Sequence, residues 1–105
     1  MSFARPYGKD CQSYEHPLGV GSGEFLLWEY PLCYWLEKEG YDVSYCSNLD
    51  LIDPQTILRA KAMISVGHDE YWDIRQYNNV KAGVEQGVNV LFLSANDIYM
   101  VTPFT

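Results

Sequence analysis

The sequence predicts an α/β fold in which helices cover a parallel β-sheet, and three observations lead to this prediction. Two short apolar runs, at residues 61–66 and 88–93, have the character of strands that are covered on both faces. A segment with helical periodicity lies between them, at residues 73–86. Strand, helix and strand in this order are typical of right-handed crossovers between parallel strands. We therefore expect a three-layer arrangement.

The first expected element is a helix over residues 24–39, where the apolar residues fall largely on one helical face and Gly40 marks the stop. Ser22 is a candidate N-cap. Pro31 would remove a hydrogen bond in the middle of this helix. A kink at this point is one solution, but the sequence favours a regular helix that begins near Glu29 and carries Pro31 in its first turn.

The later elements are, in chain order, a strand at 41–46, a short helix at 55–59, a strand at 61–66, a long helix at 73–86 and a strand at 88–93. Gly67 is expected to end the second strand, and Gly87 the long helix. Three good strands are fewer than a doubly wound sheet normally has. We therefore expect the α/β core at residues 24–105 to be part of a larger domain.

Composition narrows the class of protein. The 105 residues include 7 Lys and Arg against 14 Asp and Glu, and 48% are hydrophobic, which describes a single globular domain with a net charge of −7. Without a basic cluster, neither nucleic acid nor an anionic membrane is an expected partner. No signal peptide or membrane span is apparent, so we expect a cytoplasmic protein. Residues 1–23 are expected to be loop-rich, and the three cysteines to be buried free thiols.

Polar residues follow the strand at 61–66, at the edge where parallel sheets bind ligands. Glu70 is suited to act as a carboxylate ligand or base, and His68 as a second ligand or proton shuttle. A structural alternative is that Asp69 or Glu70 caps the next helix while Trp72 packs against it.

A second polar segment, Ser94-Ala95-Asn96, follows the last strand. A nucleophilic role for Ser94 would require a strand-to-helix elbow, and the G-x-S-x-G pattern of such an elbow is absent. A turn in which the hydroxyl of Ser94 bonds nearby backbone is therefore favoured.

Four segments carry a resemblance to a known family: Arg5-Pro6-Tyr7, residues 24–32, residues 35–43 and residues 65–72, which contain Gly-His-Asp-Glu-Tyr-Trp. Together they resemble the C-terminal catalytic domain of the large (beta) subunit of N,N-dimethylformamidase. The resemblance implies a fold similar to class I glutamine amidotransferases, which is flavodoxin-like. It also implies an amidohydrolase that cleaves the C–N bond of small N-substituted formamides. Because family members are several times longer, we expect the chain to be a fragment of that domain.

The resemblance further implies a mononuclear ferric iron held by two tyrosines and one glutamate. Matched by motif, the glutamate is Glu70, and the tyrosines are Tyr30, from Glu-Tyr-Pro-Leu, and Tyr7, from Arg-Pro-Tyr. Tyr14 is a rival for the position of Tyr7. Phenolate and carboxylate oxygens suit a hard ferric ion.

The same resemblance implies roles for the neighbouring residues. His68 and Glu70 would be catalytic, with water activated by the metal, while Asp69 and Asn96 would line the site. The implied partners are a small amide substrate, a small partner subunit and further copies of the chain. The alternative from a different class is an inactive, truncated α/β module with an interaction or structural role.

Overall fold

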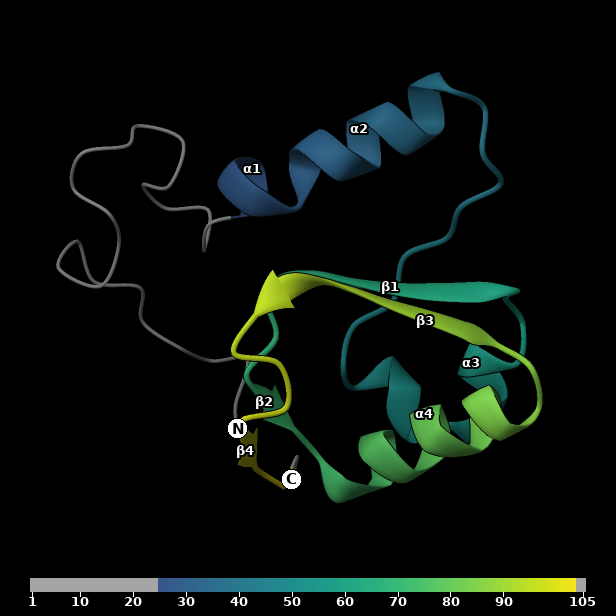
Figure 1. Ribbon diagram of the computed structural model, residues 1–105, viewed down its shortest axis with the longest axis vertical. Helices are drawn as coiled ribbons and strands as arrows, with labels where there is room; N and C mark the ends of the chain where they lie inside the picture. Colours follow the sequence, from purple (N-terminus) through teal and green to yellow (C-terminus); the bar gives the residue numbers. More distant parts are fainter. Residues whose placement is uncertain (1–24, 104–105) are drawn as a thin grey trace, which may run out of the picture. The chain divides into compact units, whose positions relative to one another are not determined.

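A computed structural model describes residues 25–103 of the chain (Figure 1). The chain divides into two compact units, residues 2–44 and residues 45–105. Each unit has its own elements, and they are taken in turn.

The unit at residues 2–44 contains α1 (Phe25–Trp28) and α2 (Tyr30–Lys38). Pro31 lies in the first turn of α2, where its missing N–H would have no partner within the helix. The helical turn of α1 precedes it, and the backbone N–H of Glu29 donates to the carbonyl of Phe25 at 3.1 Å. The prediction of a regular helix with Pro31 in its first turn is therefore confirmed.

Gly40 ends α2 as the sequence predicts. Its φ of +78° is left-handed, a conformation that glycine adopts without steric cost. The N–H of Tyr41 then donates to the carbonyl of Leu36, and the N–H of Gly40 to that of Glu37, both at 3.1 Å. This pair of bonds is a Schellman motif, which satisfies the last carbonyls of the helix.

The prediction of a strand at residues 41–46 is wrong, because this segment has no strand conformation. Tyr41 and Tyr45 are 56% and 59% exposed. Alternating polarity favours a strand only where the segment pairs with a neighbour on a half-buried surface. Among the described strands, β1 and β3 pair only with each other.

The unit at residues 45–105 holds the sheet predicted from the two apolar runs. The strands β1 (Ala62–His68) and β3 (Asn89–Ala95) run parallel, with Ala62 opposite Asn89 and His68 opposite Ala95. A second parallel pair, not predicted, joins β2 (Tyr71–Trp72) to β4 (Met100–Val101). The α/β class and the parallel pairing are confirmed. Each described sheet has two strands, so the larger three-layer sheet stays a prediction.

The helical elements of this unit are η2 (Asp50–Ile52), α3 (Pro54–Ile57) and α4 (Ile74–Glu85), and α3 and α4 lie on one side of the β1–β3 sheet (Figure 1). The carboxylate of Asp53 accepts the backbone N–H of Gln55 at 2.9 Å, which caps α3. Gly87, with a φ of +98°, follows the end of α4 as predicted. None of the helices within residues 25–103 is long and apolar enough to cross a membrane.

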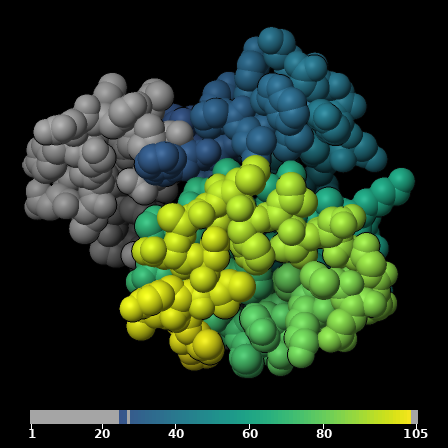
Figure 2. Space-filling view, in the orientation of Figure 1, coloured from purple at the N-terminus to yellow at the C-terminus, as the bar shows by residue number. Residues whose placement is uncertain are grey.

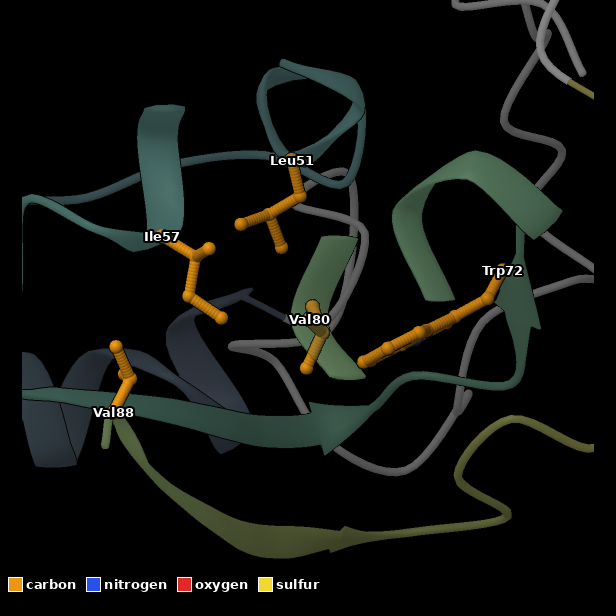
Figure 3. Close-up of a cluster of buried hydrophobic side chains, with 5 residues drawn as sticks. All are labelled: Leu51, Ile57, Trp72, Val80 and Val88. Carbon is orange, nitrogen blue, oxygen red and sulfur yellow. The ribbon is translucent and has the colours of Figure 1, made fainter. Parts of the chain in front are cut away.

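A small hydrophobic core joins these elements (Figure 3). Trp72 extends from β2 toward Val80 of α4 and is only 1% exposed. The other buried members are Leu51, Ile57 and Val88. Burial of such side chains contributes about 1.5 to 3 kcal/mol each, so this cluster holds α4 on the sheet.

The expectation that residues 88–93 form a strand buried on both faces is wrong in part. Leu91, Phe92 and Leu93 of β3 are 41%, 44% and 53% exposed. Among the described strands, β3 has a neighbour on one edge only, which leaves its other edge uncovered. Figure 2 shows this region, in yellow-green, at the surface beside α4.

Candidate functional site

The site candidates lie where β1 and β3 end. β1 continues through Gly67 to His68, so Gly67 does not end the strand as predicted. Gly67 has a φ of +88°, a left-handed backbone conformation, one residue before the end of the strand. The parallel register places His68 opposite Ala95, and Asn96 therefore follows directly beside the loop that carries Glu70.

His68, Glu70 and Asn96 form one polar group. The Nε2 atom of His68 lies 3.8 Å from Oε2 of Glu70 and 3.3 Å from Nδ2 of Asn96. The side chain of His68 is 53% exposed, and that of Glu70 is 21% exposed. An imidazole between a carboxylate and an amide can exchange a proton with a molecule bound from solvent.

Backbone conformation at Asn96 is unusual. Its φ is +55°, and Ile98 has the same value. Asparagine tolerates the left-handed region, but isoleucine does so at a cost because it is branched at Cβ. Ile98 is partly buried against the hydrophobic core, so packing holds the loop in this conformation.

Both carboxylate oxygens of Asp69 accept hydrogen bonds from other side chains of the protein. Its Oδ1 accepts from Nδ2 of Asn48 at 2.8 Å, and its Oδ2 accepts from the hydroxyl of Ser65 at 2.7 Å. Ser65 is only 5% exposed and belongs to β1. Asp69 thus lies next to the group of His68, Glu70 and Asn96 in sequence but bonds to the interior.

Neither Asp69 nor Glu70 caps α4. The N-cap is Asp73, which is 2% exposed and accepts the backbone N–H of Arg75 at 2.8 Å. The guanidinium of Arg75 also donates to both oxygens of Asp73, at 2.9 and 2.8 Å. Trp72 belongs to the hydrophobic core. The capping alternative for Asp69 and Glu70 is therefore wrong, which leaves Glu70 available at the site.

The hydroxyl of Ser94 donates a hydrogen bond to the carboxylate of Asp97. Its Oγ also lies 3.5 Å from Oγ of Ser65. The prediction of a turn residue bonded to backbone is therefore wrong, because Ser94 belongs to β3 and its partner is the side chain of Asp97 in the following turn. The sequence interpretation missed Asn48, Ser65 and Asp97. Asp97 could have been indicated by the serine that precedes it inside an apolar strand, whereas no local pattern indicates Asn48 or Ser65.

Backbone hydrogen bonds join the two loops. The N–H groups of Ile98 and Met100 donate to the carbonyls of Asp69 and Glu70 at 3.1 and 3.0 Å. The N–H of Thr102 donates to the carbonyl of Trp72 at 2.9 Å. The loop after β1 and the loop after β3 are thus held side by side.

Of the two tyrosines implied as metal ligands, Tyr30 belongs to the described residues. Tyr30 is the first residue of α2, is 46% exposed, and lies with its ring centroid 6.3 Å from that of Phe25 and 6.1 Å from that of Tyr34. It belongs to the other unit, so the structure does not test its distance from Glu70. Tyr7, like its rival Tyr14, lies outside the described residues.

Within residues 25–103, no group of three or more His, Cys, Asp and Glu side chains is gathered in a way that could hold a metal ion. A metal at Glu70 would therefore need other donors, and phenolate oxygens are chemically suited to this.

Cys33 and Cys46 are both free thiols, as predicted, but neither is buried, since Cys33 is partly exposed and Cys46 is exposed. Cys11 lies outside the described residues. The protein around the sulfur of Cys46 raises the pKa of its thiol by desolvation, and the negative charges of Asp50 and Asp69 raise it further. A raised pKa disfavours the thiolate, so Cys46 is a poor nucleophile candidate.

Comparison with known protein families matches residues 1–105, the whole chain, to the family described as N,N-dimethylformamidase beta subunit-like, C-terminal. Comparison with curated proteins and with solved structures found no match. The family match agrees with the resemblance carried by the motif Gly-His-Asp-Glu-Tyr-Trp at residues 67–72. On this match across its full length, the chain belongs to the N,N-dimethylformamidase beta subunit-like family and represents its C-terminal region.

Proposed function

We propose that the chain carries catalytic residues of an iron-dependent amidohydrolase that cleaves the C–N bond of small N-substituted formamides. The observation that supports this proposal is the group of His68, Glu70 and Asn96 at the ends of two parallel strands, in a member of this family. Ligands of parallel sheets bind at this edge.

The donor chemistry of the chain fits a ferric ion. Glu70 supplies a carboxylate that is free of any capping role, and Tyr30 and Tyr7 would supply phenolates. When bound, such an ion would polarise the amide oxygen and lower the pKa of a water molecule. The acidic balance of the chain, with a net charge of −7, also favours a cation over an anion.

The protein's own residues then handle protons and orientation. Hydrolysis adds the oxygen of water to the carbonyl carbon and breaks the C–N bond, and a proton must reach the departing amine nitrogen. His68 is half exposed and lies 3.8 Å from Glu70, so it can take the proton from water and deliver it to the amine. Asn96, through its amide, can orient the imidazole or the substrate carbonyl.

The family description names a beta subunit. We extend the proposal to an assembly in which this chain works with a smaller partner subunit and further copies of itself. Sedimentation of the chain alone and with the partner subunit tests this part of the proposal separately.

Iron content and the visible spectrum of the full chain, reconstituted with ferric iron, test the metal site. We expect about one iron per chain and a phenolate-to-iron band, and Glu70→Ala should lose both. Glu85→Ala, which removes an exposed glutamate from the end of α4, is the matched control and should keep both. A colourless, iron-free chain, or equal iron in the Glu70→Ala variant, would contradict the proposal and favour the inactive module.

The tyrosine assignment has its own matched pair. Tyr30→Phe should shift or remove the phenolate band, whereas Tyr34→Phe, one turn along the same helix, should leave it unchanged. Tyr7→Phe and Tyr14→Phe form the second pair. Hydrolysis of N,N-dimethylformamide, followed as release of dimethylamine, should fall in parallel with the band.

A further inference from the structure

Each of the two strands that end at the site carries a serine bonded to an aspartate of the following loop. On β1, the hydroxyl of Ser65 donates to Asp69 at 2.7 Å. On β3, the hydroxyl of Ser94 donates to Asp97. We call the first pair the β1 clasp and the second pair the β3 clasp.

In the sequence, the candidate site residues lie between the members of a clasp or directly after one. His68 lies between the two members of the β1 clasp in sequence, and Glu70 follows directly after Asp69. Asn96 lies between the two members of the β3 clasp. Among the described residues, the side-chain hydrogen bonds of the four clasp residues do not reach the side chains of His68, Glu70 or Asn96, so any effect on those side chains passes through the backbone.

The hydrogen bonds of Asp69 constrain its two neighbours in the chain. Asp69 lies between His68 and Glu70, so holding its carboxylate against Ser65 fixes the stretch of backbone from which both side chains extend. Asn48 strengthens this hold because its amide donates to the second oxygen of Asp69 at 2.8 Å. In the β3 clasp, the bond to Asp97 closes the turn in which Asn96 has a φ of +55°.

The two clasps also meet. Oγ of Ser65 and Oγ of Ser94 lie 3.5 Å apart, across strands that are paired in parallel. The backbone bond from the N–H of Ile98 to the carbonyl of Asp69, at 3.1 Å, joins the same two loops. The 3.3 Å contact between His68 and Asn96 therefore spans two loops that are fixed to one another from the interior side.

We propose that Ser65 and Ser94 are positioning residues, which through the two clasps fix the distance between His68, Glu70 and Asn96. This inference rests on the proposed function only for its catalytic consequence. The geometric consequence stands on the hydrogen bonds alone.

The test uses Ser94→Ala, Ser94→Thr and the control Ser47→Ala in the full chain. Ser94 is half-buried, and threonine keeps the hydroxyl that can restore the bond to Asp97. Ser47 donates its hydroxyl to Asp50 at 2.7 Å with the same three-residue spacing, but on an exposed turn outside both clasps. The control therefore removes the same kind of bond without touching either site loop.

The first readout needs neither metal nor activity. NMR of the metal-free chain should show the side-chain amide of Asn96 and the ring nitrogens of His68 changing in Ser94→Ala and returning in Ser94→Thr. The second readout is steady-state hydrolysis of N,N-dimethylformamide, where Ser94→Ala should lower kcat by roughly 10- to 100-fold with KM nearly unchanged, as expected for misplaced catalytic groups.

The outcomes separate the two proposals. Unchanged NMR signals in Ser94→Ala, or the same change in Ser47→Ala, would overturn the positioning role even if the wild-type chain hydrolyses the amide. If the wild-type chain shows no iron and no hydrolysis while the NMR pattern holds, the positioning role stands and the proposed function fails. Should Ser94→Ala unfold, Asp97→Ala removes the acceptor of the same clasp and gives the same comparison.

Discussion

Gly83→Ala is the substitution whose effect on stability the structure determines most directly. Gly83 lies in the buried face of α4. A Cβ added there would lie 2.9 Å from Cδ1 of Ile57, and 3.0 and 3.1 Å from its Cγ2 and Cγ1. Ile57 is itself 3% exposed and belongs to the hydrophobic core, so it has little room to move away.

Two opposing terms set the size of the effect. Alanine is favoured over glycine inside a helix by about 1 kcal/mol. Overpacking a tight core costs about 1 to 3 kcal/mol. Because three carbon atoms of one buried side chain are involved, we expect overpacking to win and the free energy of unfolding to fall by about 1 kcal/mol. For a domain of this size, that lowers Tm by about 4 to 8 °C.

Urea unfolding followed by tryptophan fluorescence measures this change, and a second variant identifies its cause. Ile57→Val removes the closest carbon and alone should cost about 0.5 to 1.5 kcal/mol. In the Gly83→Ala background it relieves the contact, so the double variant should be more stable than the sum of the single changes by at least about 0.5 kcal/mol. A Gly83→Ala protein as stable as the wild type, or strictly additive effects, would refute the reasoning.

Three further predictions concern charged and reactive groups. Asp73→Ala should lower the free energy of unfolding by about 1 kcal/mol through loss of the α4 cap, while Asp73→Asn, which can still accept the N–H of Arg75, should lose less in the same urea assay. Cys46 should react with iodoacetamide more slowly at neutral pH than a free cysteine does, because desolvation and nearby Asp50 raise the pKa of its thiol; an equal rate would contradict this. Hydrogen bonds from the backbone and hydroxyl of Ser47 lower the pKa of Asp50, so its stabilisation is present above the ordinary carboxyl pKa and is lost as pH falls through the lower, folded value. Asp50→Asn should therefore weaken the pH dependence of stability between about pH 5 and pH 2, measured by urea unfolding at each pH.

Much of the fold could be predicted from local signals. The end of α4 follows from a left-handed Gly87 and the start of α2 from Pro31, because each of these residues acts on its own backbone. The alternative interpretation had Asp69 or Glu70 as the cap of α4, and the structure has it at Asp73. The prediction of a strand at residues 41–46 failed because a strand depends on pairing with another strand, and alternating polarity within one segment does not show whether such a partner exists. The pair β2 and β4 was missed because two residues are too few to show a period.

The site was predictable where chemistry and sequence position coincide. His68 and Glu70 could be selected because polar residues that follow a parallel strand lie at the edge where ligands bind, whereas Asn96 was selected only through the family resemblance. Asn48 and Ser65 could not be selected, since their importance depends on hydrogen bonds to Asp69 across 21 and 4 residues of chain. A serine within an apolar strand, such as Ser65, has no evident role in the sequence until its hydrogen-bond partner, here Asp69, is known.

The backbone bonds between the loops after β1 and β3 also constrain how the length of this region can vary. The donors Ile98, Met100 and Thr102 and the acceptors Asp69, Glu70 and Trp72 form one continuous series of contacts. Inserting one residue into either loop would shift the pairing of β2 with β4 by one residue and turn the side chains of the shifted strand to the opposite face. Homologous chains that keep the site should therefore vary in length within α4 or its turns, or change both loops together, and a lone insertion in one loop should mark a chain that has lost the site.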